Sequence, residues 1–287
     1  MQALFGQLLI GLINGAFYAM LSLGLALIFG LLNIINFTHG AQYMMGAFFA
    51  WFMLTKLGVG YWWSLLLAPI AVGAFGMLIE RTMLKQLYKL DHLYGLLLTF
   101  GLALILQGLF RQEFGTSGQP YAMPSQLAGG QNLGFMFLPN YRAWVIVASL
   151  VTCLATWFVI EKTKLGAYLR AATENPTLVQ AFGINVPRMI TLTYGFGAAL
   201  AAFAGVMAAP IYNVSPNMGS ELIIVVFAVV VIGGMGSILG AIVTGFGLGV
   251  VEGLTKVFFP EASNTVIFVI MAIVLLIRPA GLFGRTA

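Results

Sequence analysis

The stretch that decides the fold is Leu4–Leu32, LFGQLLIGLINGAFYAMLSLGLALIFGLL, an apolar run interrupted only by Gln7, Asn14, Ser22 and glycines. The hydrocarbon core of a bilayer is about 30 Å thick, so a perpendicular helix needs about 20 apolar residues to cross it. At about 1.5 Å per residue this run is longer than one perpendicular crossing. The sequence therefore predicts a tilted or kinked membrane span at the N-terminus.

Eight further apolar segments follow, and together they predict about nine spans. Almost no loop separates the seventh span from the eighth, so a re-entrant or broken element, which would leave eight spans, is an open alternative. The eight segments are Phe37–Leu54, Trp62–Ile79, Leu93–Phe110, Ala143–Ile160, Met189–Ala209, Leu222–Leu239, Ala241–Val257 and Thr265–Ile277.

Composition excludes a soluble fold. Of the 287 residues, 61% are hydrophobic and 7% are charged, whereas soluble domains are about 45–50% apolar and about 25% charged. We expect an all-α, polytopic membrane protein in which residues 1–287 form one transmembrane domain. No cleavable signal is recognised, so the first span is expected to direct insertion. The single cysteine, Cys153, excludes an intramolecular disulfide.

The placement of the basic residues predicts the orientation. Lys and Arg concentrate in short cytoplasmic loops, and nine spans with an external N-terminus put nine of the 13 basic residues inside. The absence of a basic stripe with interleaved aromatic residues argues against nucleic-acid binding. The inside set is Arg81, Lys85, Lys89, Lys162, Lys164, Arg170, Arg188, Arg278 and Arg285; the outside set is Lys56, Arg111, Arg142 and Lys256.

Two loops are longer than a helix reversal needs. The first, 112–140, contains GTSGQPYAMPSQLAGGQNLG and is rich in turn-forming residues. The orientation above makes it external. A docking surface for an extracytoplasmic partner and a packed plug over the outer face are both open interpretations.

The second loop, 161–188, is expected to be cytoplasmic and to contain a short helix. Asn175 is a favoured N-cap residue and Pro176 a favoured first helical residue. A residue before proline avoids the α region, so the preceding helix should end at Asn175. Gly183 stands where a left-handed C-terminal cap is expected. An ordinary connecting loop is the alternative.

Small residues recur at the spacing that lets membrane helices approach closely. Packing within one subunit and packing against a second subunit are both open. The pairs are Gly11/Gly15, Gly236/Gly240 and Gly245/Gly249, with Gly234 beside the second pair.

Polar groups at membrane depth usually face the protein interior or a water-filled path. A structural hydrogen bond and pathway lining are both open for His39, and no second histidine stands at metal-ligand spacing, so we expect no metal site. Glu221 and Glu252 lie near expected span ends and are interpreted as interfacial. The pathway candidates are Asn14, Tyr18, Asn36, Thr38, His39, Gln42 and Gln107, with Asn33 beside them in sequence.

Motifs for catalysis are missing. The sequence contains no G-x-S-x-G, no H-E-x-x-H and no G-x-x-x-x-G-K-[ST]. We therefore expect neither catalytic residues nor ATP bound by a phosphate loop of this chain. Any ATP-driven mechanism needs its motor from another polypeptide.

Four stretches of the chain resemble the LivH/LivM-type permeases of high-affinity branched-chain amino acid importers, and the length resembles the LivH-like partner. Thr38, where that family often has alanine, and Glu174 depart from the pattern. The stretches are GLINGAFYAM at 11–20 with Gly24–Leu25, Asn33–Gly40 with Met45–Ala47, Leu169–Ala172 with Asn175–Pro176, Ala181 and Gly183–Ile184, and GGMGSILGA at 233–241 with RPAGLFG at 278–284.

The resemblance implies a bacterial inner-membrane complex. Its parts would be a homologous second permease subunit, two cytoplasmic ATPases that bind ATP and Mg²⁺, and a periplasmic substrate-binding protein. This chain would then hold no cofactor and move branched-chain or related small amino acids by alternating access, with urea or short amides as alternative substrates. The coupling segment implied is Arg170, Ala171, Asn175, Pro176, Ala181, Gly183 and Ile184.

A secondary transporter or a passive channel is the alternative class. Secondary transporters usually carry ion-coupling sites at mid-membrane. The near-absence of central carboxylates argues against proton or sodium coupling.

Overall fold

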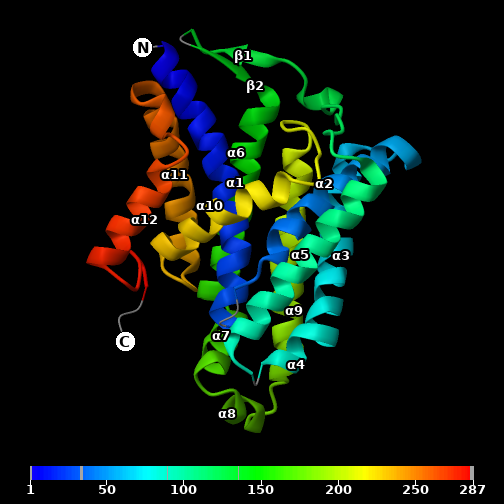
Figure 1. Ribbon diagram of the computed structural model, residues 1–287, viewed down its shortest axis with the longest axis vertical. Coiled ribbons are helices and arrows are strands. Elements are labelled where there is room, and N and C mark those ends of the chain that lie inside the picture. Colours follow the sequence, from blue (N-terminus) through cyan, green and yellow to red (C-terminus); the bar gives the residue numbers. More distant parts are fainter. Residues whose placement is uncertain (1, 33–34, 89, 135, 285–287) are drawn as a thin grey trace.

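The computed structural model describes residues 2–32, 35–88, 90–134 and 136–284, and it is mostly helical (Figure 1). Asn33, Lys89 and Arg285, named in the sequence analysis, lie outside these residues. The first helix, α1 (Gln2–Leu32), is one element of 31 residues, which at 1.5 Å per residue is about 46 Å long. It packs against α11 (Ile238–Phe258), α9 (Val186–Ala208) and α6 (Asn140–Lys162). A helix that is apolar all round has to be buried in this way.

The prediction of a polytopic membrane protein is confirmed. In the described part of the chain, six helical stretches are long and apolar enough to cross a bilayer: Leu4–Gly30, Tyr61–Leu87, His92–Phe114 (α5), Asn140–Lys162, Val186–Ala208 and Ile238–Phe258. Three more helices coincide with the other predicted spans: α2 (Thr38–Leu57), which carries more polar residues, and the shorter apolar helices α10 (Met218–Gly233) and α12 (Val266–Ile277). Since α10 and α12 have only 16 and 12 residues, the count of eight or nine spans stays a prediction.

The stretch Tyr61–Leu87 is composite. It consists of α3 (Tyr61–Ile79), the π-helical segment η1 (Glu80–Leu84) and α4 (Lys85–Leu87).

The two predicted loops lie at opposite ends of the molecule (Figure 1). The first contains η2 (Ser125–Leu127) and the antiparallel strands β1 (Gly130–Asn132) and β2 (Phe137–Pro139). The described residues are mostly helical as expected, and this short hairpin is the departure from an all-α chain. The sequence showed the turn residues of this loop, but three-residue strands have no periodicity to reveal them. The second contains α7 (Lys164–Glu174) and α8 (Pro176–Ala181), and η3 (Pro260–Ala262) joins α11 to α12.

Glycines form the seam between α1 and α11. A Cβ added at Gly249 would lie 2.3 Å from Cα of Gly15 and 2.4 Å from the carbonyl oxygen of Gly11, and a Cβ at Gly245 would lie 2.5 Å from Cα of Ala19. Backbones that approach this closely leave no room for side chains. The predicted pairs Gly11/Gly15 and Gly245/Gly249 thus meet each other within the subunit.

The other glycine-rich motif caps α10. Gly234 has φ of 98°, which favours glycine, and Gly281 lies against it. The amides of Leu282 and Phe283 donate to the last carbonyls of α10, those of Ile232 and Gly233. Gly236 lies close to Gly30 of α1, and Gly240 lies against Gly233. The stretches 233–241 and 278–284 therefore form one packed corner.

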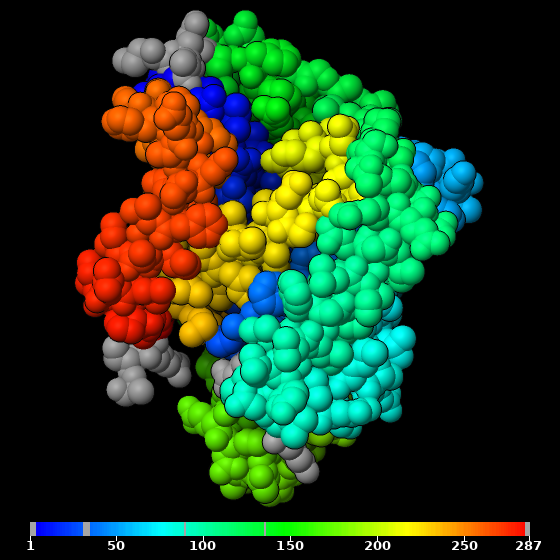
Figure 2. Space-filling model, viewed as in Figure 1, coloured from blue at the N-terminus to red at the C-terminus, as the bar shows by residue number. Residues whose placement is uncertain are grey.

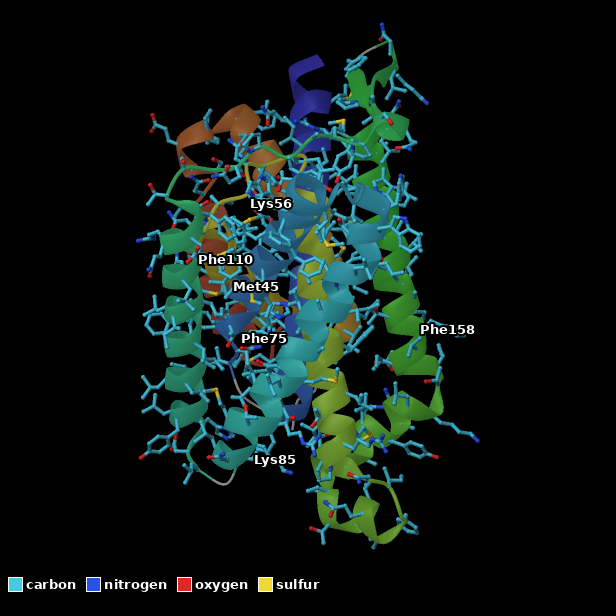
Figure 3. All side chains as sticks on the ribbon, turned by 90° about the vertical axis from the view of Figure 1, so that its right-hand side faces the viewer. Met45, Lys56, Phe75, Lys85, Phe110 and Phe158 are labelled. Carbon is cyan, nitrogen blue, oxygen red and sulfur yellow. The ribbon has the colours of Figure 1, made fainter. Side chains whose placement is uncertain are left out.

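Much of the outer surface is apolar, as expected for helices that face lipid. On α5, Leu97 and Leu104 are more than half exposed. An apolar groove of about 300 Å³ between α2, α3 and α5 includes Met45, Phe75 and Phe110, which lie at mid-height in Figure 3.

Candidate functional site

A polar pocket of about 260 Å³ lies where α1, α2 and α10 meet the connector 209–217. Figure 2 shows this face hollowed, with blue α1 between orange α11 and the yellow connector. The lining combines polar groups with apolar surface. It consists of Asn14, Phe17, Tyr18, Tyr43, Tyr212, Asn213, Ser215, Met218, Glu221 and Leu222. We call this the outer pocket because it lies toward the end that carries β1 and β2.

The pocket exists because the chain leaves helical structure between α9 and α10. Pro210 and Pro216 lie in the connector, and proline removes a backbone donor and clashes with a preceding turn. Gln119, in the loop between α5 and β1, and Val214 of the connector exchange backbone hydrogen bonds of 2.8 and 2.9 Å. The connector is thus held in place as the wall of the pocket.

A hydrogen-bonded network supports the pocket from behind. Glu252 of α11 is 5% exposed and accepts from the Tyr18 hydroxyl at 2.7 Å and the Asn14 amide at 3.2 Å. Lys256 forms an ion pair with Glu252 at 2.5 Å, and the Tyr212 hydroxyl donates to Asn14 at 3.0 Å. Buried charges are tolerated when they are paired and hydrogen-bonded in this way. Lys256 is therefore committed to Glu252.

Glu221 is the charged group that the pocket presents. It stands in the first turn of α10, where the helix dipole stabilises a carboxylate. Its side chain is exposed to the pocket and has no hydrogen-bond or ion-pair partner among residues 2–32, 35–88, 90–134 and 136–284. The outer pocket can therefore bind a cationic group such as an ammonium beside the apolar side chains of Phe17, Met218 and Leu222.

The predicted pathway residues separate into two groups. Asn14 and Tyr18 line the outer pocket, whereas Asn36, Thr38, His39 and Gln42 are fully buried. Nε2 of His39 lies 2.9 Å from the carbonyl oxygen of Leu21, which can only accept, so Nε2 carries a proton. This bond ties α2 to α1, as the structural interpretation of His39 requires.

The buried group holds unpaired polar atoms. Within the described residues, both amide atoms of Asn36 and of Gln42, Nδ1 of His39 and the hydroxyl of Tyr194 make no hydrogen bond of good geometry, although Gln42 lies beside both His39 and Tyr194. Buried polar atoms usually have one. These side chains form a polar layer between α2 and α9 whose part in the pathway stays a prediction.

Gln107 is a bracing residue between α5 and α10. Its amide donates to Asn217 at 2.9 Å and to Ser220 at 3.3 Å, and Arg111 also donates to Asn217 at 2.8 Å. Gln107 lines a small cavity of about 70 Å³ beside Gly40 and Phe37 and does not line the outer pocket.

The predicted punctuation of the second loop is present at α8. The Asn175 side chain accepts from the amide of Leu178 at 2.9 Å, and Pro176 is the first helical residue. Gly183 has φ of 83°, and the amides of Gly183 and Ile184 bond the carbonyls of Gln180 and Val179. This is the Schellman pattern.

The segment presents apolar side chains at the tip of the molecule. Phe182 is 78% exposed and Leu178 is 55% exposed, while Ala171 and Ala181 are exposed beside them. Arg170 is not available to a partner in the same way, because it bonds the carbonyl of Ile160 at 3.2 Å and Glu161 at 3.3 Å.

Sequence reasoning missed several residues that shape these regions. Glu252 was interpreted as interfacial, but it is buried under the outer pocket, and its i,i+4 spacing to Lys256 was the available signal. Tyr212 lies in a segment with no recognisable pattern. Gly166 allows α7 to fold back on α6, since a Cβ there would overlap the carbonyl of Ile160.

The outer loop is partly packed against the membrane domain. Tyr121 is 8% exposed, and burial raises the pKa of its hydroxyl to about 12, so it is neutral at physiological pH. Packing of this kind fits the plug interpretation, while β1 and β2 still offer an exposed surface at the outer end.

Comparison with known proteins agrees with this architecture. Residues 7–275 match the family described as "Branched-chain amino acid transport system / permease component". The chain belongs to this permease family. It is 31% identical to the high-affinity branched-chain amino acid transport system permease protein LivH of Salmonella typhimurium, over 97% of this chain and 95% of the relative.

Two further relatives represent related subunits. The permease protein BraD of Pseudomonas aeruginosa is 32% identical over 97% of this chain and 95% of its own length. LivM of Escherichia coli is 27% identical over 94% of this chain and 68% of its own length. No solved structure matches this chain. The relatives LivH and LivM are both named as permease proteins of the high-affinity branched-chain amino acid transport system. This likeness indicates that the chain is a non-enzymatic membrane component of a paired permease system.

Proposed function

We propose that this chain is the membrane-spanning permease subunit of an ATP-driven importer of branched-chain or related small amino acids. The observation that carries the substrate class is the outer pocket, where the unpaired carboxylate of Glu221 faces apolar side chains. An amino acid with an apolar side chain offers its ammonium group to the Glu221 carboxylate and its hydrocarbon side chain to the apolar residues of the pocket. Urea and short amides lack the ammonium, so they fit the pocket less well.

The proposed complex needs parts that this chain does not contain. A LivM-like second permease subunit completes the pathway, two cytoplasmic ATPases supply ATP hydrolysis with Mg²⁺, and a periplasmic binding protein delivers substrate to the end with β1 and β2. All nine apolar helices take part in spanning the bacterial inner membrane, with α10 and α12 as half-length elements. The N-terminus is outside and α7–α8 are inside.

Transport by alternating access then follows from the layout. The exposed Phe182 and Leu178 of α8 dock on an ATPase, and closure of the two motors moves α7–α8 together with α6 and α9. The outer pocket opens and closes as those helices shift against α1 and α10. The residues proposed for coupling are Arg170, Ala171, Asn175, Pro176, Ala181, Gly183 and Ile184, with Arg170 as an internal brace.

The substrate test is uptake into proteoliposomes that hold the complex assembled with its ATPases. We expect ATP-dependent leucine uptake, and Glu221→Gln should raise the substrate concentration for half-maximal uptake roughly tenfold, as loss of a charge-assisted hydrogen bond predicts. Glu261→Gln, an exposed carboxylate on η3, is the control. Uptake that needs no ATPase would favour a channel or secondary transporter, and uptake of urea unaffected by Glu221→Gln would refute the substrate class.

The coupling test uses two glycines with the same backbone conformation. Gly183→Val forces a β-branched residue to φ of 83° at the end of α8, and Gly58→Val does the same at φ of 66° at the outer end of α2. We expect only the first to uncouple ATP hydrolysis from uptake or to release the ATPases. Equal transport by both variants would contradict the coupling role.

A further inference from the structure

A cleft of about 810 Å³ is lined by the α3–η1–α4 stretch on one side and by Asn185 and the N-terminal half of α9 on the other. It is distinct from the outer pocket and lies toward the end of the molecule that carries α7 and α8. Figure 3 shows Lys85 near this end, well away from Lys56 toward the other end. In the proposed orientation, the cleft opens at the cytoplasmic edge of the bilayer.

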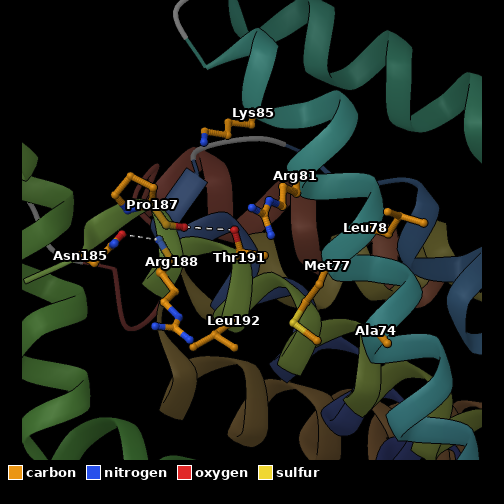
Figure 4. Close-up of a pocket in the computed structure, with 10 residues that line it drawn as sticks. All are labelled: Ala74, Met77, Leu78, Arg81, Lys85, Asn185, Pro187, Arg188, Thr191 and Leu192. Atoms are coloured by element: carbon orange, nitrogen blue, oxygen red, sulfur yellow. Dashed lines mark hydrogen bonds between the residues drawn. The ribbon is translucent and has the colours of Figure 1, made fainter.

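Three cations line the cleft: Arg81, Lys85 and Arg188. Figure 4 shows Arg81 and Arg188 on facing walls, with Lys85 above them. All three are exposed, and in the parts of the chain that the structure describes, no carboxylate pairs with them and no side-chain hydrogen bond occupies them. They differ in this respect from Arg170 and Lys256, which are ion-paired.

The carboxylate of η1, Glu80, is buried and does not line the cleft. Glu80 is 1% exposed and accepts 2.5 Å hydrogen bonds from the hydroxyls of Tyr88 and Thr191. The three cations are the charged residues that line the cleft. The free donors therefore face the opening while the negative group is held inside the wall.

The rest of the lining is apolar. Leu78 and Leu192 are 56% and 57% exposed, and Ala74 and Met77 continue the same wall along α3. Apolar surface thus runs from the cations along the membrane-spanning part of α3 and α9. A small soluble anion would make no use of it, whereas a lipid acyl chain would.

The backbone is also irregular at this place. The π-helical segment Glu80–Leu84 interrupts the α-helix at the point where Arg81 enters the cleft. Such π segments occur often at functional sites. Within this segment Glu80 is buried, whereas Arg81 is exposed and lines the cleft.

The geometry points to a binding site for the phosphodiester head group of an anionic phospholipid from the cytoplasmic leaflet. Arg81, Lys85 and Arg188 hold the phosphate, and the acyl chains lie along Leu78, Met77 and Leu192. Basic pockets between membrane helices on the cytoplasmic side bind anionic head groups in this way. This inference concerns lipid recognition and goes beyond the proposed transport function, although it rests on the proposed orientation.

The test measures lipid retained by the complex, purified from its own membranes and exchanged into vesicles of phosphatidylethanolamine with phosphatidylglycerol. We expect native mass spectrometry to show phosphatidylglycerol retained in preference to phosphatidylethanolamine. Each cation near a lipid surface contributes roughly fivefold to affinity, so Arg81→Gln with Arg188→Gln should weaken retention about thirtyfold. The control, Lys162→Gln with Lys164→Gln, removes the same charge at the same end and should retain the lipid.

A second variant separates lipid from free phosphate and does not disturb the charges. Leu192→Trp fills the apolar wall, so it should reduce phosphatidylglycerol retention, while added inorganic phosphate should compete poorly with the wild type. Equal retention by the double glutamine variant, no preference for the anionic lipid, or full competition by inorganic phosphate would overturn the proposal. Lipid retention is measured without transport. A wild-type complex that retains phosphatidylglycerol but shows no ATP-dependent leucine uptake would therefore refute the proposed function and leave the lipid site standing.

Discussion

Two buried carboxylates, Glu252 under the outer pocket and Glu80 in the wall of the cytoplasmic cleft, are stabilised in different ways. Glu252 has a cation, Lys256, at 2.5 Å and two neutral donors. Glu80 has two hydroxyl donors, and no cation lies within ion-pair distance of it in the described residues. At the outer pocket, Lys256 is paired with Glu252, so Glu221 is the charged residue that lines the pocket. At the cleft the carboxylate is hidden, so the surface presents only cations.

The charge that a site presents therefore depends on which of its charged residues are already paired with one another. Both sites hold acidic and basic residues, and composition alone would call each of them mixed. The outer pocket is left negative, which suits an ammonium, and the cleft is left positive, which suits a phosphodiester.

The largest effect should come from breaking the scaffold of the outer site alone. Gly249→Val places a side chain into the backbone of α1 at Gly11 and Gly15, and because neither backbone can move away, we expect a loss of about 3 kcal/mol or more of stability. The network between α1 and α11 should come apart. Thermal unfolding in detergent and size-exclusion behaviour measure this.

The control for the seam is Gly247→Val, since a Cβ at Gly247 meets nothing within 4 Å. It should unfold like the wild type. If Gly249→Val were equally stable, the close approach of α1 and α11 would be wrong.

A smaller effect should distinguish the two carboxylates. Glu252→Gln leaves Lys256 beside a neutral amide, and Lys256 is only 30% exposed, so we expect a loss of about 1–3 kcal/mol. Glu80→Gln loses no ion pair and should cost less. The comparison is made by the midpoint of thermal unfolding of both variants, and a larger loss for Glu80→Gln would reverse our account of the two sites.

The smallest effect should come from one hydroxyl at the cleft. Thr191→Val keeps the shape of the side chain and removes one of the two donors to Glu80, which should cost about 1 kcal/mol. Tyr88→Phe removes the other donor at similar cost. The double variant should lose more free energy of unfolding than the two single variants together, because the Glu80 carboxylate is then buried without a partner. If the two losses simply add in unfolding experiments, Glu80 has another donor.

Long apolar runs and local punctuation were predictable from the sequence. The run Leu4–Leu32 became α1, and the Asn175–Pro176 start and Gly183 end became the limits of α8, because a span length and a helix cap each depend on neighbouring residues only. The glycine spacing of α1 and α11 was visible in the same way. The sequence did not show that these two helices pack against each other.

The outer pocket was not predictable as a whole. Asn14 and Tyr18 were selected for their polarity, but their partner Glu252 is more than 230 residues away in sequence, and nothing local marks such a pairing. Tyr212 and Asn213 lie in an irregular connector whose path is fixed by a long-range contact. The cations of the cleft were counted for orientation only, since their freedom from partners is a property of the fold.

The backbone pairing of Gln119 with Val214 has a mechanical consequence. The chain between these residues contains the outer strands, α6, α7, α8 and α9, so the pairing closes this whole section into a loop pinned at the rim of the outer pocket. Helices α6 and α9 are the two arms of that loop, and α7–α8 form its far end. A push at the far end would then swing the arms about the pinned rim, so that a displacement near α8 reaches the pocket as a rotation.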